Sequence, residues 1–115
     1  MSEIKNLTDK LLAFRNERDW EQFHNLKDMA LSLALEAAEV LEHFQWKNGA
    51  VLENYIRDNR SEIGEELADV LGWVLLMAHD LDIDIYDALE KKILKNADKY
   101  PVGKAKGKYY KYNQL

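Results

Sequence analysis

The chain contains no cysteine and only one proline in 115 residues. Without cysteine it has no disulfide framework and no thiolate zinc site. The formal net charge of −5 gives no reason to expect binding to nucleic acid or to a membrane surface. The longest apolar stretches are interrupted by acidic residues or by His79, so none predicts a membrane span. Residues 1–5 lack the apolar core of a signal peptide, and we expect a cytoplasmic protein.

The residues that are present are typical of a folded protein. Apolar residues make up 47% of the chain and charged residues 32%, and no segment has low sequence complexity. This composition argues against disorder. A length of 115 residues predicts one domain with its own hydrophobic core. We therefore expect a single domain over residues 1–115, with a tail at 102–115 in which lysines alternate with tyrosines.

Helical periodicity extends along the chain, and no segment has the pattern of a strand. The expected long helices cover about 7–18, 26–46, 59–81 and 85–99, with a short helix or turn near 51–56. Asp84 is placed to cap the last helix, and Pro101 prevents its continuation. The pattern predicts an all-α protein.

The second helix carries a signal at each end. Asn25 resembles an N-cap, with Asp28 three residues later where a capping box places its acid. At the other end, Asn48-Gly49 is expected to stop the helix near Trp46, because glycine readily adopts the left-handed conformation.

The second and third long helices are apolar on more than one face. A helix on a protein surface needs only a narrow apolar stripe, whereas one that is apolar all round must be covered on every side. Four helices of one short chain cannot easily cover two such helices. We therefore predict an obligate homo-oligomer, with the extra apolar surface at a helix–helix interface.

Two pairs of carboxylates interrupt these same apolar helices: Glu36 with Glu39, and Glu66 with Asp69. The spacing i, i+3 places both members of a pair on one helix face. Burying an ionised carboxylate is costly unless it is paired or holds a metal. A hard divalent cation with oxygen ligands, such as Mg²⁺, would remove the repulsion among four neighbouring acids.

The spacing alone leaves alternatives open. Four acids that simply face solvent are one of them. A ferritin-like di-iron site is another, but it requires a Glu-x-x-His string from each of two helices. The chain has one such string, at 21–24, within a polar connection. An all-oxygen site instead favours Mg²⁺, with Mn²⁺ as the alternative, and phosphate chemistry.

Taken together, these motifs resemble a known family. The order Glu36-x-x-Glu39, linker, Glu66-x-x-Asp69 is similar to the signature of the MazG-like all-α nucleoside triphosphate pyrophosphohydrolases. Strings at 17–24, 44–47 and 96–102 bring the resemblance closest to the dCTP pyrophosphatase branch.

The resemblance implies a four-helix-bundle-like fold and hydrolysis of (deoxy)nucleoside triphosphates to monophosphate and pyrophosphate, in the service of nucleotide-pool cleaning. It implies that Glu36, Glu39, Glu66 and Asp69 hold Mg²⁺ and are the catalytic residues, without specifying which glutamate accepts the proton of the attacking water. It also implies dimers or dimers of dimers.

The resemblance extends to the nucleotide pocket. It implies that Trp20 and Trp46 stack on or enclose the base and that Lys92 and Asn96 lie near the nucleotide. Trp73 stands where the animal dCTP enzymes have a pocket tyrosine, and Leu11 stands where they have a histidine. These departures leave the base preference open, between dCTP and either dUTP or a purine nucleotide.

Other interpretations of the same residues also stay open. The tryptophans have the alternative role of core or interface anchors, and Lys92 that of a solvated lysine. The lysine-tyrosine tail resembles a phosphate-gripping arm but equally fits a solvated or subunit-wrapping segment. From a different functional class, the alternative is a non-catalytic helical module that binds a partner.

Overall fold

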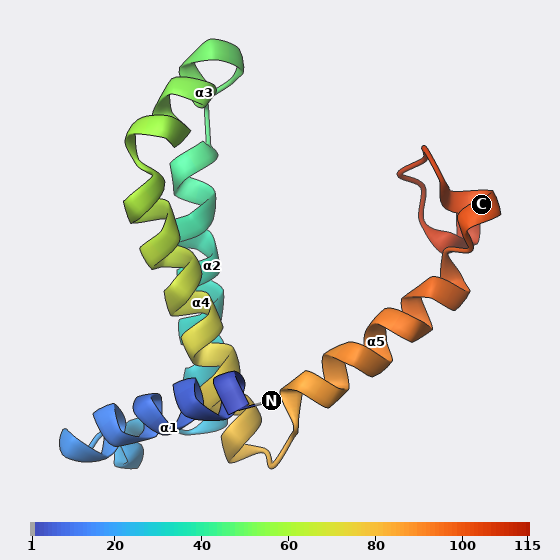
Figure 1. Ribbon diagram of the computed structural model, residues 1–115. Coiled ribbons are helices and arrows are strands. Elements are labelled where there is room, and N and C mark those ends of the chain that lie inside the picture. The colour runs from blue at the N-terminus through green and yellow to red at the C-terminus, as the bar shows by residue number, and fades with distance from the viewer. Residues whose placement is uncertain (1) are drawn as a thin grey trace. The chain divides into compact units, whose positions relative to one another are not determined.

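The computed structural model describes residues 2–115, and every regular element in this part of the chain is helical (Figure 1). The elements are α1 (Ser2–Glu17), η1 (Glu21–Phe23), α2 (Leu26–Phe44), α3 (Gly49–Asp58), α4 (Arg60–Asp80), α5 (Ile85–Lys99), α6 (Val102–Ala105) and η2 (Tyr112–Gln114). The prediction of an all-α protein is confirmed. None of these helices is long and apolar enough to cross a membrane.

The contacts between residues divide the chain into two compact units, Met1–Asp82 and Ile83–Leu115. The first unit holds α1 to α4, and the second holds α5, α6 and η2. The long helices are therefore shared between the units, and the single domain and the four-helix bundle stay predictions.

In the first unit, α2 and α4 lie side by side and run in opposite directions, with α3 joining their neighbouring ends (Figure 1). The start of α2 follows from its predicted cap: the backbone N–H of Asp28 donates to the side-chain oxygen of Asn25 at 2.9 Å. The amide of Asn25 in turn donates to the Asp28 carboxylate at 2.8 Å. The N-cap prediction is confirmed, and the cap satisfies one of the first N–H groups of α2.

A small core holds α4 against its neighbours. Its buried apolar residues are Met29 on α2 and Ile63, Leu75, Leu76 and Ala78 on α4. Beyond them, many large apolar side chains of the first unit are at least two-fifths exposed, including Leu35 at 66% and Leu41 at 60%. Much of the apolar surface of α2 therefore stays exposed to solvent within this chain.

The end of α2 corrects the prediction. The helix stops at Phe44, and the left-handed residue after it is Trp46 (φ 70°) rather than Gly49. Gly49 also has a positive φ, 53°, but it begins α3. Glycine did not mark the helix end, because the capping geometry needs its left-handed residue directly after the C-cap. Trp46 takes that place at a conformational cost of roughly 1–2 kcal/mol.

The N-terminus also differs from the prediction. Helix α1 begins at Ser2, several residues before the first expected turn. Polar contacts extend it: Lys5 pairs with Asp9 at 3.0 Å, and the Thr8 hydroxyl donates to the carbonyl of Ile4 at 2.9 Å. Periodicity of apolar residues does not detect a turn held by such i, i+4 contacts.

In the second unit, the predicted bounds of α5 are confirmed at Ile85 and Lys99. The backbone N–H of Asp87 donates to the carboxylate of the predicted cap Asp84 at 3.0 Å. The lysine-tyrosine tail contains α6, which begins directly after Pro101, and η2.

Candidate metal centre and aromatic pocket

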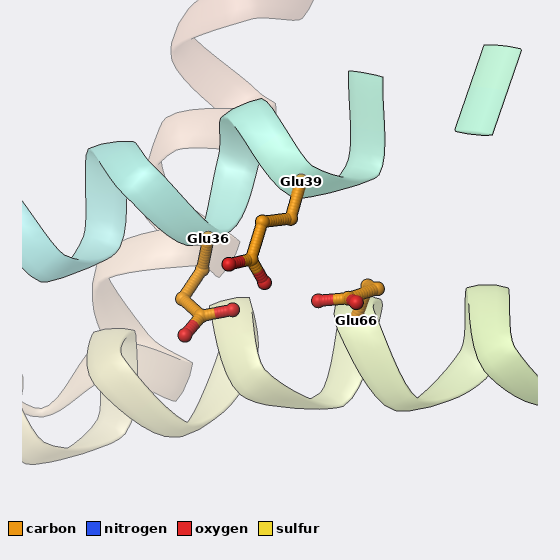
Figure 2. Close-up of side chains that lie close together, drawn as sticks. All are labelled: Glu36, Glu39 and Glu66. Atoms are coloured by element: carbon orange, nitrogen blue, oxygen red, sulfur yellow. The ribbon is translucent and has the colours of Figure 1, made fainter. Parts of the chain in front are cut away.

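Three carboxylates meet between α2 and α4. Glu36 and Glu39 extend from α2 toward Glu66 on α4 (Figure 2). One oxygen from each group can be chosen so that all three lie within 4.8 Å of one another. The i, i+3 spacing puts both α2 acids on the helix face that α4 covers. Glu36 and Glu66 are half-buried, whereas Glu39 is exposed.

The cluster has an electrostatic cost. Burial, the hydrogen bond and charge of Glu39, and the charges of Asp69 and Glu66 together raise the pKa of Glu36 to about 7. The pKa of Glu66 is also raised, first by hydrogen bonding to Glu39 and then by burial and the charge of Glu39, while His43 acts in the opposite direction. Like charges in a poorly hydrated site disfavour the ionised forms.

These residues fit a divalent metal ion. Among the described residues, Oε2 of Glu36 and Oε2 of Glu66 are buried without any hydrogen-bond partner. A buried acceptor without a donor is unfavourable, and a hard cation is a partner that satisfies two or three such oxygens at once. Because the donors are all carboxylate oxygens, they match Mg²⁺ or Mn²⁺ rather than a soft metal.

The fourth predicted ligand, Asp69, lies beside this cluster. It is exposed and is not part of the group of three, but its charge contributes to the raised pKa of Glu36. Asp69 also lines a neighbouring pocket. It therefore joins the carboxylate cluster to that pocket.

A polar cavity of about 450 Å³ adjoins the cluster. Its lining consists of Glu39, Glu42, His43, Tyr55 and Glu66. His43 Nδ1 lies 2.6 Å from the Tyr55 hydroxyl, and Lys47 Nζ lies 4.2 Å from the centre of the Tyr55 ring. Residues of α2, α3 and α4 thus enclose a polar space next to the acids.

The neighbouring pocket is mainly apolar and has a volume of about 230 Å³. Its lining consists of Leu11, Phe14, Arg15, Trp20, His24, Ala68, Asp69, Gly72, Trp73 and Leu76. Two predicted substrate-binding residues, Trp20 and Trp73, therefore lie in one cavity. Aromatic walls suit a flat ring. Because Asp69 also lines the pocket, a group joined to that ring could reach the carboxylates.

An ion pair forms part of the same wall. Arg15 is 3% exposed and donates to both oxygens of Asp80, from Nη1 at 2.9 Å and from Nη2 at 3.1 Å. Burial alone would raise the pKa of Asp80, but the bonds from Arg15 and His79 outweigh it and lower this pKa. The pair ties α1 to the C-terminal end of α4, and its arginine also lines the pocket.

His24 packs edge-on against Trp73, with ring centres 5.2 Å apart. Burial, followed by the charge of Arg15, lowers the pKa of His24. Its Nδ1 is buried and has no hydrogen-bond partner among the described residues, and the same is true of Nε of Arg15. Two residues that line the apolar pocket therefore each have one buried nitrogen without a partner among the described residues.

The other predicted substrate-binding residues lie elsewhere. Trp46 is 90% exposed at the end of α2 and lines neither of the two pockets. Lys92 and Asn96 are exposed, one turn apart on α5 in the second unit. Their roles, like those of the acids, stay predictions.

Sequence reasoning missed Arg15 and His24. A signal was available for Arg15, because Leu7, Leu11 and Arg15 follow one another at i, i+4 and so share the inner face of α1. His24 gave no comparable signal, since it lies in a connection where no period applies.

Comparison with known proteins adds three findings. Residues 31–115 match the family model described as MazG-like. The dCTP pyrophosphatase 1 of Rattus norvegicus is 36% identical over 104 residues, which cover 89% of this chain and 61% of the relative. That of Homo sapiens is 35% identical over 104 residues, with the same coverage of 89% and 61%. The chain thus spans about three fifths of the length of these curated relatives.

A solved structure is also similar. The crystal structure of a pyrophosphatase from Archaeoglobus fulgidus superimposes with a TM-score of 0.80 and 36% sequence identity. The match covers 86% of this chain and 93% of that one.

Proposed function

This chain belongs to the MazG-like family, and we propose that it hydrolyses nucleoside triphosphates to the monophosphate and pyrophosphate. The observation that carries the proposal is the meeting of Glu36, Glu39 and Glu66 within 4.8 Å, beside an aromatic pocket. The names of the relatives, dCTP pyrophosphatase 1 and a pyrophosphatase, support this reaction.

We propose that Glu36, Glu39, Glu66 and Asp69 hold Mg²⁺, with Mn²⁺ as the alternative. When bound, such an ion neutralises the triphosphate charge and makes a water molecule a stronger nucleophile at neutral pH. The half-buried setting of Glu36 and Glu66 limits the water that competes for the carboxylates. One of the carboxylates accepts the proton of the water that attacks the α-phosphorus.

The aromatic pocket holds the base in this proposal. Stacking between a base and an aromatic side chain contributes about 1–3 kcal/mol, and Trp20 and Trp73 line the pocket that adjoins Asp69. Trp46, Lys92 and Asn96 complete the proposed contacts with the nucleotide. We propose a preference for dCTP, with dUTP or a purine nucleotide as the alternative, and a role in nucleotide-pool cleaning in the cytoplasm.

Uncovered apolar surface supports self-association. Leu31, Leu35 and Leu41 on α2 are each more than half exposed. Contiguous apolar surface on a folded protein marks a binding site when it exceeds what a typical monomer shows. We propose a homo-oligomer, a dimer or a dimer of dimers, in which helices of neighbouring copies cover this face.

The reaction is tested with a panel of deoxynucleoside triphosphates and Mg²⁺, followed by orthophosphate detection with malachite green. We expect a signal only after inorganic pyrophosphatase is added, because the cut falls between the α and β phosphates. Orthophosphate without that enzyme would point to removal of the γ-phosphate and would overturn the proposal. No product from any nucleotide would favour a non-catalytic, partner-binding role.

A further inference from the structure

The polar cavity that adjoins the carboxylates is bordered by two kinds of group. Its lining includes two acids of the proposed metal site, Glu39 and Glu66, and two hydrogen-bonding rings, His43 and Tyr55. Lys47 is close to the second ring, with Nζ 4.2 Å from its centre. Anionic groups and hydrogen-bond donors therefore share one space of about 450 Å³, with a cation nearby.

The contact between the two rings leaves one nitrogen of His43 for a ligand. Nδ1 lies 2.6 Å from the Tyr55 hydroxyl, and Nε2 makes no hydrogen bond to the described residues. Both side chains are half-buried and line the cavity, so a molecule within it can touch them. The neighbouring carboxylates favour a hydrogen on Nε2, because they would repel a lone pair there. Nδ1 then accepts from the Tyr55 hydroxyl, and Nε2–H becomes a donor with a fixed direction.

The polar cavity and the aromatic pocket adjoin the acids at successive levels of α4. The pocket takes its α4 lining from Ala68 to Leu76, with Asp69 as the acid, whereas the cavity takes Glu66. Glu66 and Asp69 are three residues apart, which is a rise of about 4.5 Å along the helix. A nucleotide whose base lies in the pocket therefore brings its phosphates to the acids and, next along α4, to the cavity.

We propose that the polar cavity holds the β- and γ-phosphates, which leave as pyrophosphate, and that His43 donates to one of their oxygens through Nε2–H. Tyr55 is a positioning residue that fixes the tautomer and direction of the His43 ring. This assignment rests on the proposed function, since it places the leaving group of that reaction. When water attacks the α-phosphorus, the bond from this atom to the bridging oxygen breaks, and its electron pair leaves with the pyrophosphate. A donor beside the β-phosphate stabilises the charge that develops there.

The charges around the cavity suit a phosphate chain only when the metal site is filled. A cation bound by Glu39 and Glu66 compensates both acids. Glu42, the remaining acid of the lining, is exposed, so water and salt screen its charge. Lys47 and the His43 donor then make the space favourable for an anion. Pyrophosphate should therefore bind in the presence of Mg²⁺ and not in EDTA.

The direct test follows the histidine nitrogens by NMR as pyrophosphate is added to the full chain with Mg²⁺, with Mg²⁺ alone as the reference. The chain has three histidines, so labelled histidine gives few signals, and the one missing from His43→Phe belongs to His43. We expect pyrophosphate to shift the Nε2 signal of His43 but not that of His79, which is exposed on the last turn of α4. The free Tyr55→Phe protein should show a mixture of His43 tautomers. No shift at His43 would overturn the proposal.

Calorimetric binding of pyrophosphate and of a nucleoside monophosphate, both with Mg²⁺, separates the leaving group from the rest of the nucleotide. His43→Phe keeps a ring beside Tyr55 but removes both nitrogens, and Tyr55→Phe removes only the hydroxyl. Loss of a hydrogen bond to a charged group should weaken pyrophosphate binding about tenfold in His43→Phe, and less in Tyr55→Phe. Monophosphate affinity should be unchanged, because this ligand lacks the β- and γ-phosphates. The matched control is Tyr109→Phe, which removes a hydroxyl from a side chain that is 93% exposed.

A merely structural role of the two rings predicts that the variants weaken both ligands alike or neither, and either result would overturn the assignment. His43→Gln, whose amide still donates, should keep more pyrophosphate affinity than His43→Phe. If His43→Phe does not fold, His43→Gln assigns the NMR signal and the titration decides. A chain that binds pyrophosphate at His43 but hydrolyses no triphosphate would refute the proposed function and leave the phosphate site standing. An active chain whose His43→Phe variant binds pyrophosphate normally would refute only this inference.

Discussion

Two charged assemblies flank the same helix, and they differ in how their charges are compensated. Along α4, Glu66 meets Glu36 and Glu39, which are all acids, whereas Asp80 meets Arg15 in a two-pronged ion pair. The first assembly raises the pKa of its acids, and in the second Arg15 lowers the pKa of its acid. One is therefore unfavourable within the chain itself, and the other is internally balanced.

The difference in charge supports the proposal that the acid cluster, and not the ion pair, binds a ligand. A balanced pair has its partner already and acts as scaffold, although leaving either member alone would be costly. The cluster of acids has no opposite charge of its own, and a bound cation would compensate it. Substitutions that separate these two roles test the comparison.

The largest expected effect is on activity. Glu39→Gln or Asp69→Asn should lower turnover at least about a hundredfold, since each removes a carboxylate from the proposed metal site. The fold should persist, because neither side chain is buried. Activity is measured by pyrophosphate release, and folding by circular dichroism. Turnover that persists in both variants would remove these residues from the site.

Next in size is the loss of the balanced pair. Asp80→Ala leaves the buried guanidinium of Arg15 without its partner and should destabilise the protein by about 3 kcal/mol. The double variant Arg15→Met with Asp80→Ala should recover much of this loss. Urea denaturation measures both. If the double variant is no more stable than the single one, the pair is not a self-contained scaffold.

A smaller and opposite effect is expected at the unbalanced cluster. In the metal-free folded protein, Glu36 keeps its proton up to a pKa of about 7, compared with an ordinary value of 4.5. Protonation thus favours the folded state: this contribution is complete below pH 4.5 and is lost as the pH rises through about 7. Glu36→Gln should therefore raise the melting temperature in EDTA at pH 8.

Near pH 4.5 the same substitution should give little gain, and added Mg²⁺ should stabilise the unaltered protein more than the variant. Thermal unfolding at the two pH values, with and without Mg²⁺, provides the measurement. A gain of equal size at both pH values would mean that charge repulsion is not the cause.

The sequence predicts these two assemblies unequally. The acids stand out because carboxylates at i, i+3 interrupt apolar helices. The i, i+3 spacing and the apolar helical period are both local sequence patterns. The pairing of Arg15 with Asp80 joins residues on α1 and α4 and depends on how those helices pack, which no local pattern contains. The same reason applies to His24, whose significance appears only when Trp73 lies against it.

The helix bounds show the same limit on a smaller scale. Capping by Asn25 and Asp84 was predictable, because each cap side chain accepts a hydrogen bond from a backbone N–H only three residues later. The end of α2 was not, since the choice between Trp46 and Gly49 for the left-handed position depends on where the last turn closes.

The smallest expected effect concerns Trp46. Its positive φ is unfavourable for a residue with a side chain and lowers the stability of the fold, as the repulsion within the acid cluster also does. Trp46→Gly should be more stable than Trp46→Ala by about 1 kcal/mol, because glycine adopts the left-handed conformation without steric penalty. Both variants remove the same 90%-exposed side chain, so alanine is the matched control. Urea denaturation measures the difference.

Activity measurements on the same two variants test whether the strained backbone at Trp46 serves to place its side chain against the nucleotide. Strained backbone persists in proteins where the side chain that it presents has a function. If Trp46 contacts the nucleotide, both variants should raise KM several-fold, although glycine improves the stability. If KM is unchanged in both variants, Trp46 serves only to end α2 and does not contact the nucleotide. The repulsion among the carboxylates would then be linked to function in this protein, whereas the backbone strain at Trp46 would not.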